Sequence, residues 1–366
     1  MSATSFTPGI KLCEQFYQEA VQPILVSHFP ELKHAAALIG NGSEVLGFDD
    51  ELSTDHDWGP RVLLFVAEED QNYSEHIVQA LAQELPYGFR GYPTNWTNPD
   101  TNDNGTQALQ SVTDGPVNHR VTVQTIRSFI MEHLRFDMEQ ELEPADWLTF
   151  SEQRLLTLTS GAIYHDEVGL QKQRSRFAYY PRDVWLYLLA AGWSRISEDE
   201  HLMGRAGMVG DEVGSAIIGA RLVRDIMRLC FLMEKTYAPY PKWFGTTFKR
   251  LPGAQEIWPL LQGALCANQW QQREGFLVKA YEHLAVRHNA LQLTRPMPER
   301  TTSFFGRPFQ VIELHGFGGA LMEQIEDPRV KRIAAESPIG SLDLLSDNTN
   351  LASNPRWRPR IRQLYE

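Results

Sequence analysis

The chain has 366 residues, of which 42% are hydrophobic and 22% are charged. This length exceeds that of one ordinary domain, and the composition excludes the disordered, fibrous and membrane-embedded classes of protein. The formal net charge of −12 excludes extended nucleic acid as an expected partner, because a polyanion would be repelled. Since no apolar run long enough to span a membrane and no secretory leader are recognised, we expect a cytoplasmic protein with no membrane partner.

The first part of the chain predicts an α/β domain, residues 1–142, with a mixed sheet and flanking helices. A stretch rich in Pro, Asn, Thr, Asp and Gly at 86–115 resists regular structure and predicts a flexible insertion. Hydrophobic spacing predicts helices and strands on either side of it. In chain order, we expect a helix at 9–27, strands at 35–39 and 61–66, a helix at 74–85 and a strand at 117–126.

Beyond residue 146 the strand signals almost vanish, and helical spacing prevails for about 150 residues. This change predicts a second, mainly helical domain at 143–366, so that the whole chain is α+β. Helices are expected after Pro181 and at 213–235 and 273–287, with one possible strand at 308–314. The three cysteines are odd in number and widely spaced, which predicts buried apolar residues rather than disulfides or a zinc cluster.

One group of residues is a candidate for binding phosphates and metal ions. Gly42 and Ser43 follow the first predicted strand, and after eleven further residues Asp55 and Asp57 precede the second. A glycine turn exposes backbone N–H groups that can hold phosphates together with the Ser43 hydroxyl. Two aspartates spaced by two residues would point to the same side if they enter a strand, where their oxygens suit two Mg²⁺ ions.

This order and spacing resemble the polymerase-beta-like nucleotidyltransferase superfamily, over residues 34–67. The resemblance implies that Asp55 and Asp57 are metal ligands and catalytic groups, and that Gly42 and Ser43 hold the phosphates of ATP or another nucleoside triphosphate. It also implies transfer of a nucleoside monophosphate to an acceptor with release of pyrophosphate.

Four further segments resemble a bacterial family known only as domain of unknown function 4037, whose members carry helices after a nucleotidyltransferase domain. The segments are 47–61, Gly210–Asp211, 237–243 and 340–343. The resemblance names no substrate, so the acceptor, the choice of nucleotide and the oligomeric state stay open.

The sequence departs from the superfamily at the third carboxylate. The strand predicted at 117–126 offers Thr122 and Gln124 where an acid is expected. Either Asp114, Asp166 or Asp211 replaces it, or the site binds a nucleotide without efficient transfer. Adjacent His–Asp pairs at 56–57 and 165–166 also invite comparison with metal phosphohydrolases, but the helical bundle of spaced histidines expected there is missing.

The second domain supplies candidate helpers. Arg221 shares a helix face with Arg224 and Arg228, which suits either a triphosphate or an ion-paired surface. Lys242 lies near Tyr240 in a setting that suits a phosphate and a stacked base, or simple packing. Asp211 is a candidate base for the acceptor proton, or a helix cap.

These features predict a magnesium-dependent nucleotidyltransferase that moves a nucleoside monophosphate, AMP by preference, to a hydroxyl or amine of a small molecule or protein. The alternative is a catalytically degenerate nucleotide-binding protein that acts as a regulator or antitoxin-like module.

Overall fold

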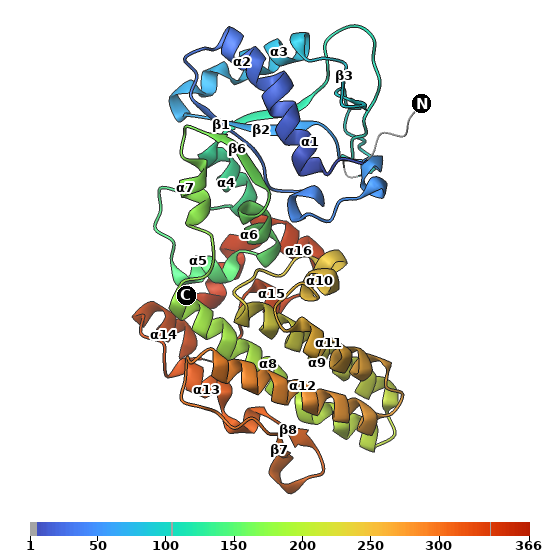
Figure 1. The fold of residues 1–366 in the computed structure, drawn as a ribbon. Helices are drawn as coiled ribbons and strands as arrows, with labels where there is room; N and C mark the ends of the chain where they lie inside the picture. The colour runs from blue at the N-terminus through green and yellow to red at the C-terminus, as the bar shows by residue number, and fades with distance from the viewer. Residues whose placement is uncertain (1–5, 104, 337) are drawn as a thin grey trace. The chain divides into compact units, whose positions relative to one another are not determined.

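The computed structural model describes residues 6–103, 105–336 and 338–366. The chain forms two compact units, of which unit 1 runs to Glu141 and resumes at Arg154–Ala178, while unit 2 holds Leu142–Gln153 and Tyr179–Glu366. The predicted α+β class is confirmed: a mixed four-stranded sheet with flanking helices is followed by a mainly helical part (Figure 1). None of the described helices is long and apolar enough to cross a membrane.

The central sheet of unit 1 has the strand order β5-β2-β1-β6. Strand β1 pairs antiparallel with both β2 and β6, and β2 pairs parallel with β5. Two short strands, β3 and β4, form a separate ribbon inside the segment predicted to be irregular. The strands span His34–Leu38 (β1), Arg61–Val66 (β2), Gly88–Phe89 (β3), Tyr92–Pro93 (β4), Arg120–Thr125 (β5) and Ala162–Asp166 (β6).

Helices cover both faces of this sheet (Figure 1). One face packs on α1–α3 through a core that includes Phe16, Val62 and Leu81. On the other face Phe129 of α4 meets Phe65 of β2, with ring centroids 5.5 Å apart. The helices are α1 (Gly9–Phe16), α2 (Gln22–His28), α3 (Ser74–Glu84), α4 (Ile126–Leu134), α6 (Glu152–Thr159, which contains the unit boundary) and α7 (Leu170–Ser175).

The first predicted helix is present but is interrupted by a π-helical turn at Tyr17–Val21. Pro23 lies in the first turn of α2 and lacks the N–H that a regular helix would need. Prolines and single π-turns are both recognised causes of irregularity within a helix, and here they are adjacent.

Unit 2 is built around the long helices α8 and α9, against which α11, α12 and α13 pack. The predicted helices after Pro181 and at 213–235 and 273–287 correspond to α8, α9 and α12. The longer helices are α8 (Arg182–Met208), α9 (Glu212–Met233), α10 (Pro241–Phe248), α11 (Ala254–Cys266) and α12 (Trp270–Ala290). The shorter elements are α5 (Pro144–Thr149), β7 (Thr302–Ser303), β8 (Gln310–Val311), α13 (Phe317–Met322), α14 (Pro328–Ala334), α15 (Leu342–Leu345), α16 (Thr349–Ser353) and α17 (Arg358–Arg362).

Two expectations need correction. Strand β6 falls where strand signals had almost vanished, because it is short and its first four residues are all half-buried, without alternation between buried and exposed. Residues 154–178 therefore belong to unit 1. The chain passes between the two units more than once, instead of dividing a single time near residue 142. Of the three cysteines expected to be buried, Cys266 is exposed at the end of α11.

The return of the chain to unit 1 depends on Gly161. Its φ of +75° and its closeness to β1 leave no room for a side chain, since a Cβ would overlap the carbonyl oxygen of Leu38. Gly169 has a similar φ of +84°, but nothing lies within 4 Å of its Cβ position.

We therefore expect Gly161→Ala to lower the free energy of unfolding by about 2–5 kcal/mol, the sum of a left-handed backbone penalty and overpacking. Gly169→Ala should cost only about 1–2 kcal/mol, the backbone penalty alone. Urea unfolding measures both. Equal losses in the two variants would contradict the packing of β6 against β1.

Candidate functional site

The predicted phosphate-binding turn joins β1 to the loop that precedes β2. Gly40 and Gly42 have φ values of +83° and +135°, which favour glycine. A Cβ at Gly42 would overlap the guanidinium of Arg61 and the carboxylate of Glu44. The Ser43 hydroxyl is half-buried and accepts or donates no hydrogen bond within the described part of the chain. The turn therefore closes over the protein's own ion pair and leaves a hydroxyl free.

That ion pair consists of Arg61, the first residue of β2, and Glu44. Nε and Nη2 of Arg61 donate to Oε1 of Glu44 at 3.0 and 2.5 Å, and Nη2 also donates to the carbonyl oxygen of Asn41 at 2.7 Å. The Glu44 side chain is 2% exposed. Such charge-assisted bonds are strong when they are shielded from water. They hold the turn after β1 against the start of β2.

The acidic loop places both predicted aspartates before β2 rather than in it. Asp55 ends a short 3₁₀ helix, and Asp57 adopts a left-handed backbone with φ of +49°. Since β2 begins at Arg61, strand alternation does not orient the two carboxylates. The side chains of Asp55 and Asp57 are 65% and 45% exposed, so both are accessible to a ligand.

In each aspartate, one carboxylate oxygen contacts a neighbouring basic side chain. Oδ1 of Asp55 lies 3.0 Å from Nδ1 of His56, and Oδ1 of Asp57 accepts from Nη1 of Arg120 at 2.6 Å. Although desolvation acts to raise the pKa of Asp55, the hydrogen bond and charge of His56 lower it below its ordinary value. The Oδ2 atoms accept no hydrogen bond from any residue that the structure describes.

The third carboxylate is absent from the strand beside β2. Strand β5 starts with Arg120, which is in register with Arg61, and continues with Thr122 and Gln124. Of the candidate replacements in unit 1, Asp114 is exposed. Asp166 ends the far edge strand, where its oxygens accept from the backbone N–H groups of residues 169–171. In the described residues, Asp55 and Asp57 join no group of three metal-binding side chains within 4.8 Å of one another.

The predicted helpers belong to unit 2. Asp211 caps α9, accepting from the N–H of Gly214 at 2.7 Å, and so acts as the helix cap considered from the sequence. Arg221 pairs with Asp199 at 2.9 Å. The ammonium of Lys242 lies 4.9 Å from the ring centroid of Trp243. Tyr240 lies just before α10 and donates its backbone N–H to Gln153.

Tyr240 lines a cavity of about 180 Å³ within unit 2, whose walls include Arg224, Arg228 and Phe244. Nε and Nη1 of Arg228 have no hydrogen-bond partner in the described chain. Arg224 donates to Asp347 at 2.5 Å. The cavity therefore brings together two of the three arginines expected on one helix face, whereas Arg221 is engaged elsewhere.

Two buried carboxylates lie next to this cavity. Asp343 lines it and accepts the backbone N–H of Glu152 at 2.8 Å, while Oε1 of Glu152 lies 3.8 Å from Nη1 of Arg228. Burial first, and then the charge of Asp343, raise the pKa of Glu152 to about 7. Burial also raises the pKa of Asp343. Arg228 therefore supplies one positive charge to two acids.

Glu44, Arg61 and Arg120 in unit 1 and the acid pair in unit 2 were not predicted from the sequence. For the residues of unit 1, the sequence did contain a local signal. Glu44 follows the Gly–Ser turn directly, and an arginine begins each of the two neighbouring strands. The Glu152–Asp343 pair joins residues 191 positions apart, which no local pattern reveals.

The raised pKa of Glu152 predicts a pH-dependent stability. The unfolded carboxyl loses its proton near pH 4.5, whereas the folded one keeps it until about pH 7. The stabilising contribution is therefore complete below pH 4.5 and is lost as the pH rises towards 7. We expect Glu152→Gln to flatten the fall in unfolding free energy between these pH values, measured by urea denaturation.

Glu336→Gln removes an exposed carboxyl of the same unit and serves as the matched control. It should leave the pH profile of the wild type unchanged. A profile of Glu152→Gln as steep as that of the wild type would show that Glu152 does not take up the proton.

No curated protein matches the chain. A solved structure, a nucleotidyltransferase-like protein from Exiguobacterium sibiricum 255-15, matches at 11% sequence identity and a TM-score of 0.32, over 81% of this chain and 82% of that chain. Residues 147–244 match a family described as a domain of unknown function (DUF4037). The likeness to that family is thus confirmed over residues 147–244, which include Glu152, Arg228, Tyr240 and two of the four segments expected to carry it, Gly210–Asp211 and 237–243.

Proposed function

We propose that this protein is a metal-dependent nucleotidyltransferase, with nucleotide bound by unit 1. One observation carries the proposal. The antiparallel pairing of β1 and β2 brings the end of β1 next to the start of β2, so the Gly40–Ser43 turn and the loop with Asp55 and Asp57 meet at one end of the sheet. This is the order of parts that the superfamily resemblance implies.

The donor set fits a hard cation. Asp55 and Asp57 offer exposed carboxylate oxygens, and one oxygen of each has no hydrogen bond to the described chain. Oxygen ligands of this kind suit Mg²⁺, which keeps several waters and is shared with substrate phosphates. When bound there, Mg²⁺ would neutralise charge on the phosphates during transfer.

Arg120 is the basic side chain that we propose binds the phosphates. Arg120 lies 4.7 Å from the ring centroid of Trp96 and donates to Asp57, so its planar fork is held at the edge of the aspartate loop. Arginine forks match phosphate oxygens. We assign Arg120 to the triphosphate, together with the free Ser43 hydroxyl and the N–H groups of the glycine turn.

In the proposed reaction a hydroxyl or amine of the acceptor attacks the α-phosphate of the nucleotide in line. A bond forms between the acceptor atom and the α-phosphorus, the bond to the bridging oxygen breaks, and pyrophosphate leaves with the electron pair. The acceptor proton passes to a base or to water. We propose ATP as the nucleotide and leave the acceptor as a small molecule or a protein side chain.

Calorimetry with the four ribonucleoside triphosphates and Mg²⁺ tests nucleotide binding. We expect at least one to bind, and Asp55→Ala plus Asp57→Ala to abolish the magnesium-dependent part. Glu69→Gln plus Asp70→Asn makes the same change in net charge in the 3₁₀ helix Glu68–Tyr73 of unit 1 and should bind as the wild type does. Identical binding by the wild type and the Asp55/Asp57 variant would contradict the site.

A specific observation favours a second candidate, a nucleotide-binding protein without transferase activity. Arg120 and Arg61 occupy the carboxylates of Asp57 and Glu44, and β5 carries no acid. Pyrophosphate release with a panel of hydroxyl and amine acceptors, together with the intact mass of the protein, separates the two. Nucleotide binding without product in any reaction would favour the degenerate protein.

Arg120 provides a further test. We expect Arg120→Met to weaken nucleotide binding about tenfold or more, since one hydrogen bond to a charged group contributes about 1.5–3 kcal/mol. Arg90→Met is a matched control, because Arg90 also pairs with a carboxylate, Glu19, and lies 5.7 Å from an aromatic ring centroid. Unchanged nucleotide affinity in Arg120→Met would limit Arg120 to holding Asp57.

A further inference from the structure

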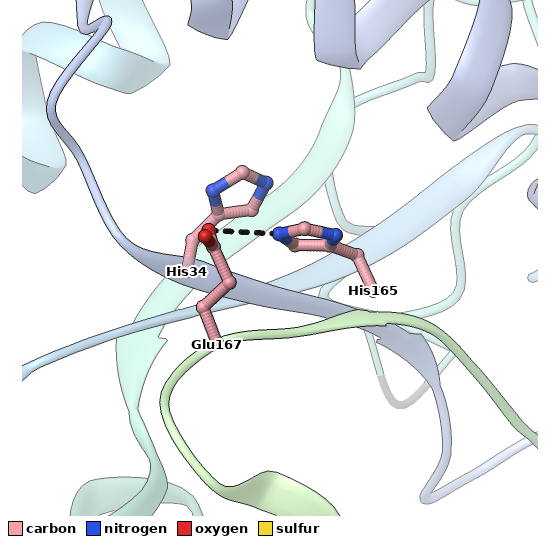
Figure 2. A group of neighbouring side chains, drawn as sticks. All are labelled: His34, His165 and Glu167. Atoms are coloured by element: carbon pink, nitrogen blue, oxygen red, sulfur yellow. Dashed lines mark hydrogen bonds and ion pairs between the residues drawn. The ribbon is translucent and has the colours of Figure 1, made fainter.

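A second group of side chains that could bind a metal lies at the start of β1 and on the neighbouring edge strand β6, whereas the proposed nucleotide site lies at the other end of β1. His34, His165 and Glu167 each offer one ligand atom, and these atoms all lie within 4.8 Å of one another (Figure 2). His34 begins β1, His165 lies in the edge strand β6, and Glu167 follows that strand. None of the three belongs to the nucleotide site proposed above.

A β-bulge brings these side chains together. His165 pairs with Ala36 and Ile163 with Ala37, so Tyr164 is an extra residue in β6. A bulge turns two successive side chains towards one face. Both Tyr164 and His165 accordingly lie near Tyr17, with ring centroids 6.4 and 6.3 Å from its ring.

Strand geometry places the other two ligands on that face. Glu167 follows His165 by two residues, and its N–H donates to the carbonyl oxygen of His34 at 3.0 Å, which extends the pairing of β1 with β6. Nε2 of His165 lies 2.9 Å from Oε2 of Glu167. The imidazole of His34 lies across from them, with its centroid 4.6 Å from that of His165 (Figure 2).

Contacts around His34 prepare it as a ligand. Nδ1 lies 3.3 Å from the carbonyl oxygen of Leu32, and Nε2 lies 2.8 Å from the hydroxyl of Tyr17. The Leu32 carbonyl accepts from Nδ1, which fixes the tautomer and leaves the ring's lone pair on Nε2, the usual arrangement around a metal-binding histidine. The Tyr17 hydroxyl donates to this lone pair, so a metal at Nε2 would replace that hydrogen bond.

We infer that His34, His165 and Glu167 form a site for a divalent transition metal of the zinc class, which joins the edge strand β6 to β1. Two imidazoles and a carboxylate suit zinc rather than Mg²⁺ or Ca²⁺, which take oxygen ligands. Tetrahedral ligands about 2.1 Å from zinc lie about 3.4 Å apart. The site reaches this spacing through small side-chain rotations, for which the half-exposed Glu167 has room.

Calorimetric titration with Zn²⁺ of the 366-residue chain, after its treatment with a chelator, tests the site. We expect one Zn²⁺ ion whose binding excess Mg²⁺ does not displace. His165→Gln and Glu167→Gln should each weaken it at least about tenfold. Co²⁺ in place of Zn²⁺ should give visible absorption without a thiolate charge-transfer band, which separates this site from the exposed Cys266.

Two controls keep the test specific. His28→Ala removes a second exposed His–carboxylate pair, with Glu84, that lacks another histidine, and it should bind Zn²⁺ like the wild type. Asp55→Asn plus Asp57→Asn should also keep the ion, which separates this result from that of the nucleotide site. Thermal unfolding without metal checks that His165→Gln is folded, and added Zn²⁺ should raise the midpoint of the wild type but not that of His165→Gln.

The inference is overturned if the wild type and His165→Gln bind Zn²⁺ equally, or if neither binds it. It is equally overturned if His28→Ala loses the ion to the same extent as His165→Gln.

Discussion

The ion pair between Arg61 and Glu44 organises the part of the protein in which we place nucleotide chemistry. Glu44 is almost fully buried, and Arg61 reaches from the first position of β2 both to this carboxylate and to the backbone of the turn after β1. A buried charge without its partner carries a large desolvation penalty, so removal of either residue would unsettle the turn. Gly42 is required in this turn because the pair occupies the space of a side chain.

The same end of the sheet shows how positive charge is distributed in an acidic protein. Arg61 and Arg120 begin neighbouring parallel strands in register, and each binds a carboxylate. The net charge of −12 describes the whole chain and conceals this local pairing.

Much of the fold could be predicted because its signals are local. The strand at 61–66, the helix near 74–84 and the long helices of unit 2 follow from hydrophobic spacing over adjacent residues. Strand β6 could not, since its first four residues are half-buried, its last is exposed, and its partner β1 lies more than 120 residues earlier. The spacing of Asp55 and Asp57 identified an accessible acidic loop, but their partners His56 and Arg120 and the backbone turn at Asp57 come from the folded loop.

Strand β6 also bears on how the protein is made. The sheet of unit 1 has an open edge at β1 until residues 162–166 have been added, and by then the chain has already passed through the first segment of unit 2. During synthesis on the ribosome, β1 therefore waits with unpaired backbone groups, a state in which strands of different chains can associate. A gene fragment that stops at the first crossing, after Glu141, would encode a sheet with this edge permanently open.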